Sequence, residues 1–371
     1  AVPDLPQPRP QPAPRPPSNP GLPAGATFPR AAWTRAAARA LAELPDADLG
    51  YGPPAGHARL RLELSAYLGR VRALLAPPER ILVVNGFAQA GRLVADVLRE
   101  RGVTAIGVED PGSKGLRDQL TRAGLTCVPV PVDGQGVRVD VLERSTLRAV
   151  VVTPAHQFPT GVVTSPDRRH ALLRWARDTD GLVLEDDYDA EFRYDRTPVG
   201  ALQGLGPDVV IYGGSVSKTL APGLRIGWLV VPDHLVAAFT DAKYAIDLAT
   251  GTLEQVTLAD FLASGEMDRH IRRMAAHYRT RRDRLVTAIA THLPDWEVTG
   301  TAAGLHLLLR PPSHFDEHDL AALAQRCGLD ARPLRDYAFR ERDRPGLVIG
   351  YGHRHPDALA KAVTELGRSL R

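Results

Sequence analysis

A lysine in a turn rich in glycine and serine is the strongest chemical signal in the sequence. Residues 211–228 read Ile-Tyr-Gly-Gly-Ser-Val-Ser-Lys-Thr-Leu-Ala-Pro-Gly-Leu-Arg-Ile-Gly-Trp, which places Ser215, Ser217, Lys218 and Arg225 between two strand-like runs. The amine can form an imine with an aldehyde, and the hydroxyls and the rigid guanidinium can hold a phosphate. The cofactor that fits this set is pyridoxal 5′-phosphate (PLP). The alternative is a surface lysine beside a Gly/Ser turn, but the arginine seven residues on and the flanking strands favour the cofactor site.

A carboxylate that could serve the same cofactor follows the predicted strand at 182–185. The run Glu-Asp-Asp-Tyr occupies residues 185–188. PLP is a full electron sink only when its pyridine nitrogen is protonated, and a charge-assisted hydrogen bond to that proton contributes about 1.5–3 kcal/mol. We expect Asp186 to pair with the ring nitrogen and Tyr188 to hydrogen-bond the ring oxygen O3′. The alternative is a carboxylate that caps a helix and a tyrosine in the core.

Composition excludes several other classes of function. The two cysteines, Cys127 and Cys327, give neither a disulfide framework nor metal-site spacing, so we expect a reducing cytoplasm. His314 and His318 have helical spacing but no evident third ligand, which indicates a solvent-facing pair and no metal site. The net charge of +3 is small for 371 residues and is not typical of nucleic-acid binding. No apolar run approaches the ~20 residues of a membrane span.

Strands and helices alternate through the middle of the chain, which favours an α/β fold with a mainly parallel sheet covered on both faces. The seven predicted strands are 80–84, 105–108, 126–131, 149–153, 182–185, 209–212 and 226–231. Such sheets bind ligands at the carboxyl ends of their strands. The polar runs that follow predicted strands are Asn85-Gly86, Glu109-Asp110, His156-Gln157, Asp186-Asp187 and the turn of Lys218.

The segments on either side of this region have different patterns. Residues 1–25 are rich in proline and poor in large apolar side chains, which predicts an extended linker. Two amphipathic helices are expected at 28–44 and 57–74. A long arginine-rich helix at 267–293 precedes an α+β segment that we interpret as a smaller domain. We interpret the basic face of that helix as solvated or subunit-packing rather than as a nucleic-acid site, because aromatic residues are sparse there.

Five segments together resemble MocR-type regulators, a branch of the GntR transcription factors. They are His-Gln-Phe-Pro-Thr-Gly (156–161), Leu-Glu-Asp-Asp-Tyr-Asp-Ala-Glu-Phe-Arg-Tyr-Asp (184–195), residues 214–228 around the lysine, Arg-His-Ile-Arg-Arg-Met (269–274) and Ala-Gly-Leu-His (303–306). In that family a variable linker joins an N-terminal winged helix-turn-helix to an aminotransferase-like domain that binds PLP. The resemblance covers about residues 26–371. It implies a fold-type I architecture and a homodimer with cofactor sites near the subunit interface.

The resemblance also implies a division of the chain. Residues 1–25 would be the interdomain linker, and the DNA-binding domain would be missing from this chain. Residues 26–75 would contribute to the small domain and the dimer interface. Residues 76–265 would form the large PLP-binding domain with a seven-stranded sheet, and residues 266–371 the connecting helix and the small C-terminal domain.

Further cofactor contacts follow from the resemblance. Tyr51 matches a family position that reaches the phosphate bound by the partner subunit. Phe158 replaces the family's asparagine at the ring oxygen, so Gln157 or His156 would have to substitute for it. The phosphate cup would be formed by backbone N–H groups of Gly86, Phe87 and Ala88 together with Ser215, Ser217 and Arg225.

Ser113 marks a departure from the family pattern. Residues 109–113 read Glu-Asp-Pro-Gly-Ser, where the family has a tyrosine that stacks on the cofactor ring. The substitution implies weaker stacking or room for a different effector. Lys114 and Arg117 are nearby candidates for contact with an effector carboxylate.

The leading hypothesis is a PLP-binding, effector-sensing and dimerisation domain of a transcription regulator. An amino compound, or PLP itself, would act through aldimine exchange at Lys218. The alternative from another class is an active aminotransferase in which Lys218 is also the proton shuttle. A third hypothesis is a degenerate domain that only dimerises.

Overall fold

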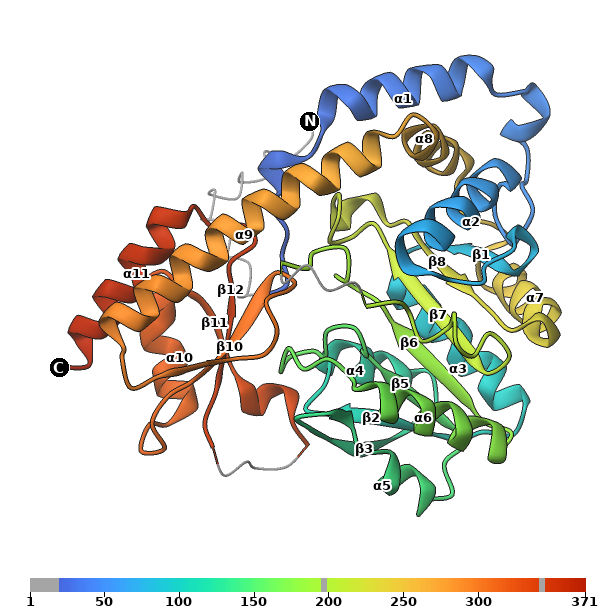
Figure 1. Cartoon of the computed structure of the whole chain (residues 1–371). Helices are drawn as coiled ribbons and strands as arrows, with labels where there is room; N and C mark the ends of the chain where they lie inside the picture. The colour runs from blue at the N-terminus through green and yellow to red at the C-terminus, as the bar shows by residue number, and fades with distance from the viewer. Residues whose placement is uncertain (1–19, 195–198, 340–343) are drawn as a thin grey trace, which may run out of the picture.

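A large eight-stranded sheet is the centre of the molecule in the computed structural model, which describes residues 20–194, 199–339 and 344–371 (Figure 1). The predicted linker 1–25 therefore lies largely outside the described residues. The strand order is β1-β8-β7-β6-β5-β2-β3-β4. The strands are β1 (Ile81–Val84), β2 (Ala105–Asp110), β3 (Thr126–Asp133), β4 (Gly136–Val137), β5 (Ala149–Val152), β6 (Leu182–Asp186), β7 (Val210–Ser215) and β8 (Gly227–Val230).

The predicted α/β fold with a mainly parallel, mixed sheet is confirmed. Five adjacent strands, in the order β3-β2-β5-β6-β7, run parallel to one another, whereas β8 pairs antiparallel with both β7 and β1. The predicted number of strands was seven, and the eighth is β4, which pairs antiparallel with the end of β3. A strand of two residues is too short to show a hydrophobic period, so the sequence pattern could not indicate it.

Helices cover both faces of the large sheet. Successive side chains of a strand point to opposite faces, and here both sets are apolar and need to be buried. Leu82 and Val84 of β1 belong to one apolar core, and Ile81 and Val83 belong to the core on the opposite face. The first core is completed by α3 (Phe87–Glu100), α4 (Lys114–Arg122) and α7 (Val236–Asp247). The opposite face is covered by α1 (Arg30–Glu43), α2 (Ala58–Arg72), α5 (Val139–Glu143), α6 (Pro166–Asp178) and α8 (Thr252–Ala263).

The position of α1 and α2 differs from the expectation that residues 26–75 contribute to the small domain. Their buried residues, among them Ala36, Leu60 and Leu64, pack with Trp228 of β8 in the core on the large sheet. The cause is the apolar stripe of each helix, which meets α8 and the sheet.

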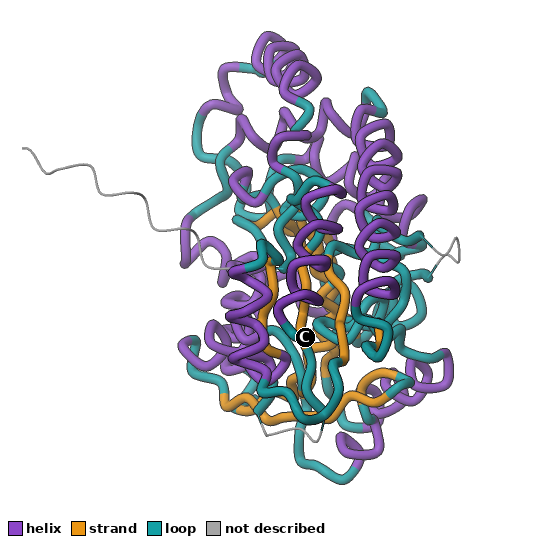
Figure 2. Tube along the Cα trace, turned by 90° about the vertical axis from the view of Figure 1, so that its left-hand side faces the viewer, coloured by secondary structure: helices purple, strands orange, loops and turns teal. Residues whose placement is uncertain are grey.

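A smaller α+β unit follows the large sheet, as predicted. Its four antiparallel strands have the order β11-β12-β10-β9 and run from Glu297–Thr299 (β9) and His306–Arg310 (β10) to Asp330–Pro333 (β11) and Leu347–Gly350 (β12). Helices α9 (Glu266–His292), α10 (Glu317–Arg326) and α11 (Pro356–Ser369) pack on these strands, and α11 with the end of the chain faces the viewer in Figure 2.

Helix α9 connects the two units. Its 27 residues span about 40 Å. Met267, near its start, is buried in a core of the large sheet, whereas Tyr278, Leu285 and Ile289 are buried in the core of the small unit. Figure 1 shows this helix running diagonally from beside α8 to beside α11. Among the described residues, no helix combines the length and apolarity needed to cross a bilayer.

Candidate cofactor site

A cavity of about 290 Å³ opens at the carboxyl ends of the strands of the large sheet. Parallel strands bring their carboxyl ends to one edge, and the side chains that follow β2, β5, β6 and β7 meet there. Its volume is near the lower end of the roughly 300–1,000 Å³ typical of small-ligand pockets. The predicted site residues that line it are Phe87, Ala88, Asp186, Tyr188, Ser215, Ser217, Lys218 and Arg225.

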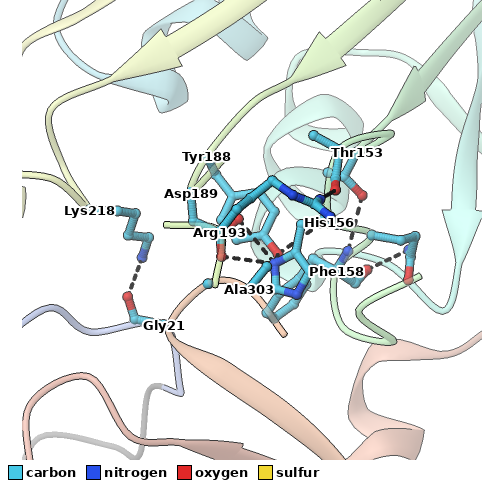
Figure 3. A network of polar contacts seen from close by, with 12 residues as sticks. Gly21, Thr153, His156, Phe158, Tyr188, Asp189, Arg193, Lys218 and Ala303 are labelled. Atoms are coloured by element: carbon cyan, nitrogen blue, oxygen red, sulfur yellow. Dashed lines mark hydrogen bonds and ion pairs between the residues drawn. The ribbon is translucent and has the colours of Figure 1, made fainter. Parts of the chain in front are cut away.

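Lys218 extends into this cavity from the turn after β7. Its amine donates a hydrogen bond to the carbonyl oxygen of Gly21, at 2.7 Å (Figure 3). Burial lowers the pKa of the Lys218 amine, although Asp189 and Asp186 act in the opposite direction. A lowered pKa increases the neutral fraction of the amine, which is the form that attacks an aldehyde.

Arg225 lies over the turn between β1 and α3. The residue has a left-handed backbone with φ of 54°, and its Nη2 donates to the carbonyl oxygen of Asn85 at 2.7 Å. Gly86 must be glycine here, because its φ is +76° and a Cβ would lie 2.7 Å from Nη2 of Arg225. The guanidinium therefore lies beside the N-terminus of α3, where N–H groups and the helix dipole favour an anion. This cradle suits a phosphate.

Asp186 presents a half-buried carboxyl to the same cavity. Burial and the neighbouring Asp187 raise its pKa well above the ordinary value, while Lys218 lowers it. Asp187 itself accepts hydrogen bonds from Arg72 Nε at 2.7 Å and from the Tyr212 hydroxyl at 2.8 Å. A protonated ring nitrogen placed against Asp186 would act in the same direction as Lys218 and stabilise the ionised carboxylate. The donor set thus fits PLP.

Tyr188 lines the cavity, and its hydroxyl is held from behind by His156. The hydroxyl donates to the His156 carbonyl oxygen at 3.0 Å and lies 3.1 Å from His156 Nδ1 (Figure 3). Burial raises the pKa of Tyr188 well above its usual value, so the phenol stays protonated. The hydrogen bond from Tyr188 to a cofactor ring oxygen stays a prediction. To form it, the hydroxyl would have to leave or share its present contact with His156.

Behind Tyr188 lies a buried cluster that the sequence analysis did not find. His156 Nδ1 is 3.0 Å from Asp189 Oδ2, and candidate ligand atoms of His156, Asp189 and His306 all lie within 4.8 Å of one another. Burial and the neighbouring His156 lower the pKa of His306 well below its usual value. Asp189 and His306 belong to segments that carry the family resemblance, but His306 comes from β10 of the small unit. Sequence spacing could not indicate that contact between domains.

Gln157 differs from its expected role at the cofactor ring. Its side-chain Nε2 donates to Glu109 Oε2 at 3.1 Å, to the Pro111 carbonyl at 2.9 Å and to the Phe158 carbonyl at 2.6 Å. The residue is fully buried and is not part of the cavity wall. Its amide is used to hold the loops together, so we correct its assignment from cofactor contact to loop support.

The remaining predicted residues have mixed positions. Tyr51 is 94% exposed and does not line the cavity of its own chain. Both observations agree with the expectation that it reaches the partner subunit. Ser113 does line the cavity, and its Oγ accepts from the backbone N–H of Leu116 as the N-cap of α4. Lys114 instead pairs with Asp118 at 2.6 Å. Arg117 packs over the Phe339 ring at 4.2 Å.

Comparison with known proteins identifies relatives of two kinds. The model of the family "Aminotransferase class I and II" matches residues 20–344. The chain is 33% identical over 350 residues to the probable rhizopine catabolism regulatory protein MocR of Rhizobium meliloti, covering 94% of this chain and 71% of that protein. It is also 33% identical to the pyridoxine biosynthesis transcriptional regulator PdxR of Corynebacterium glutamicum, over 95% of this chain and 76% of the relative.

An enzyme has a very similar structure. The alpha-aminoadipate aminotransferase LysN of Thermus thermophilus, solved as a complex with N-(5′-phosphopyridoxyl)-L-leucine, matches with a TM-score of 0.83 and 27% identity. The match covers 94% of this chain and 90% of that one. The fold is therefore shared with PLP-dependent aminotransferases and is not limited to regulators.

Proposed function

Because the chain belongs to the aminotransferase class I and II family, we propose that the cavity around Lys218 binds PLP and serves as the sensor of a MocR-type transcription regulator. The observation that carries the cofactor assignment is the convergence of an amine, a carboxyl and an anion cradle on one cavity: Lys218, Asp186 and Arg225. When bound, PLP would supply an aldehyde for amines and a protonated pyridine ring that withdraws electrons.

Each side chain has a defined task in this proposal. Arg225, the N-terminus of α3 and the hydroxyls of Ser215 and Ser217 would hold the phosphate. Asp186 would hold the proton on the ring nitrogen. Lys218, whose pKa is lowered by burial, would provide the nucleophilic amine and accept or return protons at its Nζ.

The regulatory role is supported by the relatives named as regulators. The surface of the domain supports a dimer. Exposed apolar side chains include Leu49, Tyr51, Leu248 and Leu253, and Gly52 lies against Thr252. These residues therefore gather near one another, and exposed apolar clusters mark interfaces. We assign this surface to a homodimer in which Tyr51 reaches the cofactor of the partner subunit. DNA would be bound through a helix-turn-helix domain, as the relatives named transcriptional regulators suggest, and the effector would be an amino compound or PLP itself.

The test of the cofactor site is spectroscopic. PLP is titrated into the wild type, Lys218→Ala and a matched control, Lys114→Ala, whose exposed lysine pairs with Asp118. The wild type and Lys114→Ala should show the same absorbance band of a lysine-bound cofactor, and Lys218→Ala should lack it. An unchanged spectrum in Lys218→Ala would refute the assignment.

The same sample distinguishes a sensor from the alternative, an active aminotransferase, which the likeness to LysN favours. Amino acids are added with and without a 2-oxo acid. A spectral shift that stops after one equivalent supports the sensor. Formation of oxo acid over many equivalents would show an enzyme instead.

A further inference from the structure

A second and larger cavity lies between α2, the start of α9 and the segment after β6. Its volume is about 580 Å³, compared with about 290 Å³ for the cofactor cavity. This volume is within the range of roughly 300–1,000 Å³ for small-molecule sites. The proposed function assigns no ligand to it.

Positive side chains dominate the wall of this cavity. The wall carries four arginines and two carboxyl residues: Arg70, Arg72, Arg193, Arg272, Asp268 and Glu191. One of the carboxylates, Asp268, already accepts a hydrogen bond from Arg70 at 2.8 Å. The other, Glu191, is a weak source of negative charge, because burial and the neighbouring Asp187 raise its pKa to about 7. Asp187 balances the charge of Arg72 from behind the wall. Counted with it, the described residues set four arginines against Asp268, Asp187 and the partly neutral Glu191, which leaves a small positive excess.

Two residues of the wall, Tyr67 and Arg72, each carry a buried polar atom with unused capacity to donate. Tyr67 Oη and Arg72 Nη2 are buried and have no hydrogen-bond partner within the described part of the chain, and the two residues are only 3% and 5% exposed. The other nitrogens of Arg72 are engaged, Nε with Asp187 and Nη1 with the Val199 carbonyl, both at 2.7 Å. Leaving a buried donor unpaired costs about 1–3 kcal/mol. An acceptor in the cavity would remove that cost.

We propose that this cavity is a binding site for a small organic anion. Its carboxylate or phosphate accepts hydrogen bonds from Tyr67 and Arg72, and its carbon skeleton packs against Val71 and Ile271, which also line the cavity. The site is linked to the cofactor cavity, because Asp187 lines that cavity and forms the ion pair with Arg72. An anion bound to Arg72 would thus contact the partner of Asp187, which itself lines the cofactor cavity.

The test measures anion binding directly, so it does not depend on DNA binding or on turnover. Succinate and inorganic phosphate are titrated calorimetrically into the PLP-loaded protein in a chloride buffer, where bound PLP already fills the phosphate cup. We expect saturable binding of one anion per chain by at least one probe. Succinate binding alone would identify a carboxylate ligand, and phosphate binding alone a phosphate ligand. Failure of both probes to saturate would overturn the proposal.

Three variants locate the site. Tyr67→Phe removes one donor and Arg272→Gln removes one charge, and each should weaken binding about tenfold, the effect of losing one charge-assisted hydrogen bond. Arg273→Gln is the matched control, because its exposed arginine is the next residue on α9 and does not line the cavity. Equal weakening by Arg273→Gln would show a diffuse charge effect and refute the site. Arg72 is left intact, because its buried ion pair with Asp187 supports the fold.

Discussion

The amine of Lys218 and the carbonyl oxygen of Gly21 are joined by a hydrogen bond of 2.7 Å across 197 residues of sequence. Gly21 belongs to the first described segment of the chain. This segment is packed closely against the small unit, because a Cβ at Gly350 would meet Pro20 at 2.5 Å and the Ala24 N–H donates to the Tyr278 hydroxyl at 3.1 Å. Residues 20–25, the end of the predicted linker, are therefore packed against the small unit, and Gly21 contacts the residue that would react with PLP.

We predict that PLP loosens residues 20–27, because a Lys218 nitrogen bonded to the cofactor no longer donates to Gly21. Loss of one hydrogen bond, worth about 1 kcal/mol, should raise amide hydrogen exchange in this segment about fivefold. Lys218→Met, which keeps the chain length but removes the donor, should show the faster exchange without PLP and no further change with it. Helix α11 is the internal control. Equal exchange in all samples would contradict the prediction.

Arg225→Ala should weaken PLP binding by about 10- to 150-fold. The substitution removes a charge-assisted phosphate contact of about 1.5–3 kcal/mol. The measurement is the dissociation constant of PLP from absorbance titration. Arg92→Ala is the matched control, because Arg92 lies on α3 but is exposed and pairs with Asp96 at 2.7 Å. The phosphate cradle would be wrong if the two variants bound PLP equally well.

The patterns in the sequence were sufficient for seven of the eight strands of the large sheet and for most of the cavity wall, because these depend on local signals. Lys218, Asp186 and Arg225 each follow or precede a strand with a clear apolar run. Helix α8 had no such signal: positions 255–261 are buried without interruption, so the helix shows no amphipathic period. The role of Gln157 was missed because its hydrogen bonds go to Glu109 and to backbone groups, which a motif comparison does not show.

Glu109 should make the protein less stable as the pH rises. Burial raises its pKa from 4.5 to about 7, although Thr153 and Gln157 lower it through hydrogen bonds. A carboxyl with a raised folded-state pKa stabilises the fold fully below pH ~4.5 and loses that contribution, ~3 kcal/mol, as the pH rises through ~7. Between roughly pH 5.5 and pH 8, about 2 kcal/mol should be lost from the free energy of unfolding.

Glu109→Gln isolates this effect, because its amide does not titrate. Urea unfolding of the variant should show a pH dependence that is flatter than that of the wild type by about 2 kcal/mol over the same interval. Glu143→Gln, at an exposed carboxylate of α5, serves as the control and should keep the wild-type slope. If Glu109→Gln also kept that slope, Glu109 would not be the titrating group.

Ser113→Tyr should tighten PLP binding while it destabilises α4. Ser113 lines the cavity where the family resemblance places a tyrosine that stacks on the cofactor ring, and aromatic stacking contributes about 0.5–1.5 kcal/mol. The affinity for PLP should therefore rise about 2- to 10-fold. The same substitution removes the Oγ that caps α4 through Leu116 N–H, which costs about 1 kcal/mol of unfolding free energy.

Ser113→Ala separates the two effects, because it loses the cap without adding a ring. Both variants should unfold at lower urea concentration than the wild type, and only the tyrosine variant should bind PLP more tightly, as measured by absorbance titration. Equal affinity in the two variants would show that the ring of PLP does not lie against residue 113. Tighter binding by the tyrosine variant would show that serine at this position keeps the affinity for PLP below what the same cavity can reach. A site that senses PLP must also release it, and a lower affinity meets that requirement.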